Sequence, residues 1–77
     1  MKLLYVEWVD SMVAASGWSD TEGTEAIVPA KIRSVGWLLR ETGDAITLIA
    51  HDGQDEVAGF MVIPKCAIKK RRVLKSP

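Results

Sequence analysis

The residues best suited to chemistry in this 77-residue chain form a cationic run near its C-terminal end. Lys69, Lys70, Arg71 and Arg72 are consecutive, and Lys65 lies four positions before them. Cations bind phosphate groups and aromatic rings stack on bases, so we predict a ligand or partner site made of Trp18, Lys65, Lys69, Lys70, Arg71 and Arg72. The alternative is an edge strand charged to prevent edge-to-edge pairing, and the sequence slightly favours it.

The distribution of charge bears on which ligand such a site would take. Residues 57–77 hold six basic and no acidic residues (+6), whereas residues 1–56 hold four basic and ten acidic ones (−6), so the net charge is zero. Acidic loops would repel a long nucleic acid, and a small nucleotide fits better because it is held locally. A basic patch that meets an acidic patch on another copy would also favour a homo-oligomer.

Other reactive residues have simpler explanations. His51, the only histidine, stands beside Asp52 at a hairpin, where a solvated turn residue is favoured over an acid–base pair. Cys66 follows Lys65, and a plain buried cysteine is favoured over a reactive thiolate. The carboxylates between 52 and 56 lack the spacing of a calcium loop. We therefore expect no catalytic residue, no metal and no cofactor, and a protein that is not an enzyme.

Composition favours one globular domain spanning residues 1–77, with a frayed end at 75–77, because 48% of the residues are apolar and 26% are charged. The single cysteine suits a reducing compartment. No apolar run has the length of a membrane span, and Glu7 and Asp10 argue against a signal peptide. We expect a cytoplasmic protein that contacts no membrane. Its small size favours self-association.

Alternating apolar residues between turn signals predict an all-β chain. The expected strands are Lys2–Val9, Ala30–Glu41, Ala45–His51, Val57–Ile63 and Ile68–Leu74. Asp10–Ala26 is predicted to be a long first loop, and Pro64–Ala67 a short helical turn before the last strand. A change of phase near Ser34 and Val35 suggests a bulge, and Gly43 suggests a hairpin turn with positive φ.

Strand periodicity also assigns side chains to faces. Trp8 and Trp37 are predicted to be core residues, and Trp18 is the aromatic residue predicted to be exposed. In the last strand, Lys70 and Arg72 should share the face of Ile68 and Leu74, and Lys69 and Arg71 the face of Val73. Because an apolar interior excludes unpaired charges, this strand should contain a bulge or form an irregular edge.

The order of these elements resembles that of SH3-like barrels. The most specific part is Gly59-x-x-x-x-Pro64-x-x-x-Ile68, in which the proline opens one helical turn and Ile68 starts the final strand. The resemblance implies a small five-stranded SH3-like barrel. Ala67 occupies the position of the tyrosine that peptide-binding members use in their groove, so recognition of proline-rich peptides is not expected.

A second resemblance is to short proteins of tailed bacteriophages and prophages. It is carried by Trp8-Val-Asp-Ser11, Gly17-Trp18, Ser34-Val-Gly-Trp-Leu-Leu39, Ile63-Pro-Lys65 and Ile68-Lys-Lys-x-x-Val-Leu74. It implies a binding protein in the host cytoplasm. Our first hypothesis is counter-defence, by binding a host protein or sequestering a small nucleotide. The alternatives are a nucleic-acid-binding accessory protein that uses the basic strand, and a virion assembly component.

Overall fold

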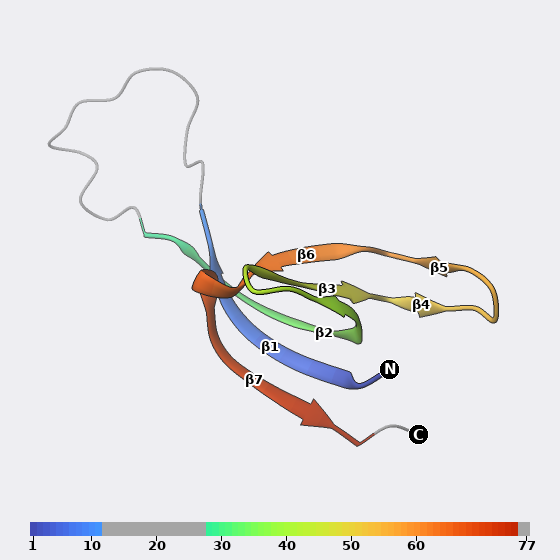
Figure 1. Cartoon of the computed structure of the whole chain (residues 1–77). Helices are drawn as coiled ribbons and strands as arrows, with labels where there is room; N and C mark the ends of the chain where they lie inside the picture. Colours follow the sequence, from blue (N-terminus) through green and yellow to red (C-terminus); the bar gives the residue numbers. More distant parts are fainter. Residues whose placement is uncertain (12–27, 76–77) are drawn as a thin grey trace, which may run out of the picture.

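The described residues of the computed structural model, 1–11 and 28–75, form an antiparallel sheet of five strands and a two-stranded arm (Figure 1). The described part of the chain is therefore mostly β, in agreement with the predicted class. Trp18 and most of the predicted long loop lie outside the described residues. The elements in chain order are β1 (Leu3–Asp10), β2 (Ala30–Glu41), β3 (Ala45–Ile49), β4 (His51–Asp52), β5 (Val57–Ala58), β6 (Met61–Pro64), a 3-10 turn (Lys65–Ala67) and β7 (Ile68–Leu74).

The strand order in the sheet is β6-β3-β2-β1-β7, so the last strand returns to lie beside the first. β1 is paired on both sides, with β2 and with β7. β6 and β7 are not paired with each other, so the sheet keeps two edges and does not close within the described part of the chain. Its one helical turn is the predicted turn after Pro64, and none of the helical structure described there is long and apolar enough to cross a membrane.

Two of the predicted strands are each divided in two. Ala50 separates β3 from β4, and Gly59 and Phe60 separate β5 from β6. Gly59 has a φ of +75°, and a Cβ atom at this position would lie 2.7 Å from the Cβ of Ala50. Only glycine allows both the positive φ and this close approach. The β4–β5 arm beyond this point projects away from the sheet (Figure 1).

The β2–β3 hairpin is confirmed, but the prediction of a positive φ at Gly43 is wrong, since only Gly59 has one among the described residues. Thr42 organises the turn instead. Its hydroxyl oxygen accepts the N–H groups of Asp44 (3.3 Å) and Ala45 (3.2 Å), and its own N–H donates to the Ala45 carbonyl at 2.9 Å. These hydrogen bonds pair the backbone N–H groups of the turn, so no residue needs a positive φ.

The bulge expected at Ser34 and Val35 is also wrong, because the β1–β2 register runs without a break through both residues. The irregularity in β2 lies between Leu38 and Arg40, in its pairing with β3. The apolar phase changes for another reason: Ser34 and Gly36 occupy the core-facing positions, opposite Val6 and Leu4. Because a polar and a small residue stand at these two core-facing positions, the apolar alternation in the sequence looks as if the register had shifted.

The core is formed by residues from strands that are not neighbours. Leu4 and Val6 of β1 pack with side chains of β3 and β6, so the sheet curves strongly to bring them together (Figure 1). Its buried members are Leu4, Val6, Ile46, Leu48 and Ile63, and Trp8, Leu38 and Ile68 pack against them. Each buried aliphatic side chain contributes about 1.5–3 kcal/mol. Trp8 and Trp37 are both half-buried: Trp8 packs against the core, in agreement with the prediction, whereas Trp37 lies outside this cluster.

Candidate functional site

The pairing of β1 with β7 divides the basic run between the two faces of the sheet. Arg72 is opposite Tyr5 and Lys70 is opposite Glu7, whereas Arg71 is opposite the buried Val6. Residues directly opposite one another in an antiparallel pair share a face. Lys70 and Arg72 therefore lie on the outer face, and Arg71 lies on the face that carries the core.

A register shift occurs where Glu7 pairs with Lys70 and the next residue, Trp8, pairs with Ile68. Lys69 is left without a partner, so the irregularity predicted in this strand is confirmed. It reverses the alternation of faces and makes one assignment wrong: Ile68 shares the core face with Trp8 and not the face of Lys70. The bulge allows Ile68 to face the core although four consecutive charged residues follow it.

Two of the predicted site cations are bound to a carboxylate. The Lys65 Nζ lies 2.8 Å from Glu41 Oε2, and the Arg71 guanidinium makes two contacts with the same carboxylate, of 3.2 and 3.3 Å. The hydrogen bond from Lys65, followed by that from Arg71, lowers the pKa of Glu41 below its ordinary value. These contacts link the 3-10 turn and β7 to the end of β2. Lys65 and Arg71 thus have a structural role here.

On the outer face, a short polar chain runs from Arg72 to Glu7. The Arg72 guanidinium carbon lies 5.8 Å from the centroid of the Tyr5 ring, within cation–π range. The Tyr5 hydroxyl donates a hydrogen bond of 2.6 Å to Glu7 Oε2. This bond, with burial as the second cause, raises the pKa of Tyr5 above its ordinary value. Arg72 therefore covers an aromatic ring of its own chain.

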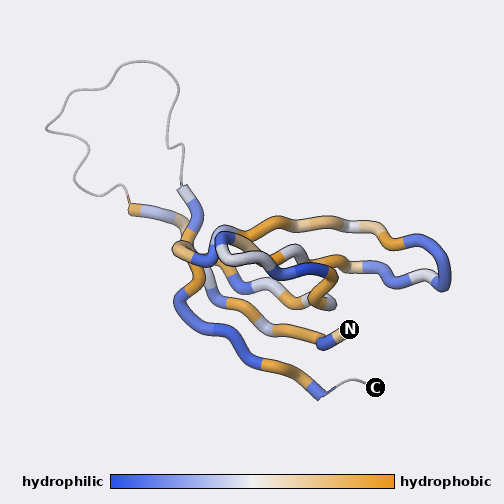
Figure 2. Tube along the Cα trace, viewed as in Figure 1, coloured by the Kyte–Doolittle hydropathy of each residue, from blue (hydrophilic) through white to orange (hydrophobic). Residues whose placement is uncertain are grey.

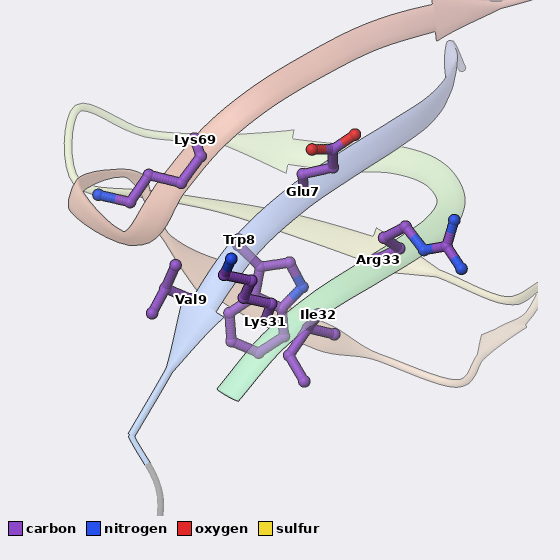
Figure 3. Close-up of a pocket in the computed structure, with 7 residues that line it drawn as sticks. All are labelled: Glu7, Trp8, Val9, Lys31, Ile32, Arg33 and Lys69. Atoms are coloured by element: carbon purple, nitrogen blue, oxygen red, sulfur yellow. The ribbon is translucent and has the colours of Figure 1, made fainter. Parts of the chain in front are cut away.

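A pocket of about 540 Å³ lies where the C-terminal end of β1 pairs with the N-terminal end of β2, and Lys69 of β7 is also part of its wall (Figure 3). Three cations, one carboxylate, one indole and two aliphatic side chains form its wall. They are Glu7, Trp8, Val9, Lys31, Ile32, Arg33 and Lys69. Trp8 is opposite Ile32 in the β1–β2 register, so indole and aliphatic side chain form one apolar surface.

The orientation of the Trp8 ring is fixed from within the fold. Its Nε1–H donates to the Ser34 Oγ at 3.0 Å, and that hydroxyl lies 3.7 Å from the Sδ of Met61 on β6. The ring also packs against the core cluster. The polar edge of the indole is therefore satisfied, and the residue presents a pre-positioned aromatic surface beside the pocket.

The pocket cations have a different environment from Lys65 and Arg71. Among the described residues, the two ion pairs are those to Glu41, and neither involves Lys31, Arg33 or Lys69. Lys31 and Arg33 were missed because they are two isolated cations flanking Ile32 in the sequence. The available signal was their alternation, which places both on one face of a strand.

The remaining reactive residues lie elsewhere. Cys66 is exposed in the 3-10 turn, which contradicts the prediction of a buried thiol, because Ile68 rather than Cys66 packs against the core. His51 and Asp52 are exposed at the base of the arm, in agreement with solvated residues. The described residues contain no cluster of three or more side chains able to hold a metal ion.

Comparison with known proteins provides no relative for this chain. No family model, curated protein sequence or solved structure matches it significantly. The function must therefore be inferred from the pocket and the charges around it.

Proposed function

We propose that this chain is a non-enzymatic binding protein that holds a small phosphate-bearing molecule with an aromatic ring, such as a mono- or cyclic nucleotide. The observation that carries the proposal is the pocket of about 540 Å³, whose wall includes three cations and one indole. This volume is within the range of about 300–1,000 Å³ typical of small-molecule sites. Cations bind phosphate oxygens through charge-assisted hydrogen bonds, and an indole stacks on a base.

Each part of the pocket has a role in this proposal. Lys31 and Lys69 come from different strands, β2 and β7, and would hold the phosphate from two sides. Trp8 would provide the surface for the base. Glu7 would accept a hydrogen bond from an amino or hydroxyl group of the ligand, as it does from Tyr5. The mixed charge of the wall favours a small ligand over a polyanion.

The strand order supports an SH3-like fold for this site. The last strand pairs with the first, three strands are joined by hairpins, and one 3-10 turn precedes the last strand. In this reading the pocket lies near the last pair of residues that joins the first two strands, Asp10 and Ala30.

Binding of a long nucleic acid is the second candidate, favoured by one observation. Arg33, Glu7 and Lys70 lie side by side across β2, β1 and β7 on the outer face, with Arg72 one row away. A phosphate backbone would contact these cations. Against it, Glu7 interrupts the row, and Lys65 and Arg71 are bound to Glu41. The small ligand is therefore the better proposal.

The resemblance to phage proteins supplies a biological setting for the proposal. A small protein in the host cytoplasm that sequesters a nucleotide would act in counter-defence. Binding of a host protein would serve the same end through a different surface. A role in virion assembly has no supporting contact or charge pattern among the described residues.

The test is a thermal-shift and calorimetric titration of the whole chain with mono- and cyclic nucleotides and with inorganic phosphate. A ligand at about 100 times its Kd stabilises the native state by about 2.7 kcal/mol, which raises the Tm measurably. Lys69→Gln should weaken the shift. Lys70→Gln is the matched control, because it removes the same charge from the next residue, which is not part of the pocket wall.

Three outcomes separate the candidates. A Tm increase that is lost in Lys69→Gln and kept in Lys70→Gln supports the pocket. No Tm change with any nucleotide overturns the proposal. Binding of short DNA or RNA at low salt that weakens equally in both variants, and falls steeply as salt is added, favours the nucleic-acid candidate instead.

A further inference from the structure

The two edges of the sheet differ in their chemistry. β7 carries the basic run, and charged side chains along an edge oppose pairing with another strand. β6 has no such protection, because the stretch from 57 to 64 contains no charged residue. Figure 2 shows this difference as a hydrophobic β6 and a hydrophilic first half of β7. β6 is therefore the edge open to pairing.

Backbone hydrogen bonds indicate which residues of β6 face this open edge. The N–H of Lys65 donates to the Asp44 carbonyl beside β3 at 2.8 Å, and in the same register Ile63 stands opposite Ile46 of β3. At the base of the arm the N–H of Ala50 is shared between the carbonyls of Ala58 (3.1 Å) and Gly59 (3.2 Å). Backbone groups of successive residues point in opposite directions along a strand. Ile63 therefore directs its N–H and C=O toward β3, and Val62 directs its own toward the open edge, as does Phe60, the residue just before β6.

The side chains of the same two residues are also free. Phe60 is 61% exposed and Val62 is 63% exposed, whereas Ile63 on the opposite face is fully buried. In an antiparallel pair of identical strands centred on Met61, Phe60 of the first copy stands opposite Val62 of the second. By symmetry, Val62 of the first copy stands opposite Phe60 of the second. Aromatic and β-branched residues are favourable cross-strand partners. The edge is thus complementary to itself.

We propose that β6 pairs antiparallel with β6 of a second copy of this chain, about a two-fold axis at Met61, to form a homodimer with one continuous sheet. Phe60 and Val62 of both copies would exchange about four backbone hydrogen bonds. The match of Phe60 with Val62 in both directions favours a second copy of this chain as the partner.

Sedimentation equilibrium of the whole chain over a micromolar-to-millimolar series tests the pairing. The wild type should reach a mass of about 17 kDa, twice the 8.5 kDa of one chain. Val62→Lys places a charge at the open edge and should leave an 8.5 kDa monomer. Val73→Lys is the control, since Val73 is 58% exposed on the other edge strand and its replacement should leave the dimer intact.

Amide exchange of the wild type gives a second readout that needs no substitution. The N–H of Val62 should exchange more slowly as the protein concentration rises, and the N–H of Ile63 should not change, because it already faces β3. An 8.5 kDa species at every concentration overturns the proposal. Dissociation by Val73→Lys in place of Val62→Lys, or Val62 exchange that is independent of concentration, overturns it as well.

Discussion

Gly36 is a position at which a single added methyl group should disturb the sheet. It lies on β2 opposite Leu4, and a Cβ atom there would be 2.9 Å from the carbonyl oxygen of Ile49 and 3.1 Å from the Cβ of Leu48. The first contact is with backbone and the second is with the start of a side chain. Neither can rotate away, so Gly36→Ala must displace β3, which carries part of the core.

The magnitude follows from two opposing effects. Overpacking a close contact costs about 1–3 kcal/mol. Replacing a glycine by alanine where there is space gains about 0.4–1 kcal/mol, because the unfolded chain loses conformational freedom. Gly43→Ala is the matched control, since Gly43 has no positive φ and no heavy atom would lie within 4 Å of the new Cβ. The unfolded-state gain is common to both variants and cancels between them, so their free energies of unfolding should differ by roughly 1–3 kcal/mol.

Urea unfolding measured by far-ultraviolet circular dichroism is the assay. We expect a lower midpoint for Gly36→Ala, an equal or higher midpoint for Gly43→Ala, and the same m-value for both, because the surface exposed on unfolding is unchanged. A midpoint for Gly36→Ala at or above that of Gly43→Ala would mean that β2 and β3 do not approach so closely, and the reasoning would fail.

Three further predictions concern charge. The lowered pKa of Glu41 means that its carboxylate stabilises the fold above its ordinary pKa of 4.5 and loses this effect as the pH falls through the lowered value. Glu41→Gln should therefore reduce the Tm at neutral pH, and its difference from wild type should vanish in acid. Glu7→Gln should bring the pKa of Tyr5 back toward 10.0, followed by phenolate absorbance, and an unchanged titration would contradict the hydrogen bond. Lys70→Thr with Arg72→Thr should open the β7 edge and give species larger than the dimer in sedimentation, because head-to-tail pairing of β6 with β7 does not close.

The all-β class and the turn before the last strand could be predicted because their signals are local. Alternation of apolar residues marks each strand, and Pro64 marks the entry to the 3-10 turn. The alternation gave a wrong prediction at the two core-facing positions of β2 that hold a polar or a small residue instead of a large apolar one. Ser34 faces inward because it accepts the indole N–H of Trp8, and Gly36 faces inward because β3 approaches it. Neither reason can be read from neighbours in sequence.

The candidate site was predicted only in part, because it depends on contacts between distant strands. Lys69 is predicted from the sequence to be a site residue, and it lines the pocket. Its neighbours Trp8, Lys31 and Arg33 come from β1 and β2, and the register that places them together is a property of the folded sheet. Trp18, the aromatic residue chosen from the sequence, lies outside the described residues. The sequence therefore predicts that cations contribute to the site, but it does not predict which residues lie beside them.

The basic run therefore has no single explanation, and its residues divide by the direction in which each side chain leaves the sheet. Arg71 points to the core face and is bound by Glu41, so it holds β7 in place. Lys70 and Arg72 point outward and keep the β7 edge from pairing. Lys69, the residue of the bulge, has no partner in β1 and forms part of the pocket wall. One register shift thus converts an edge-protecting sequence into a strand that also contributes a cation to the wall of the pocket.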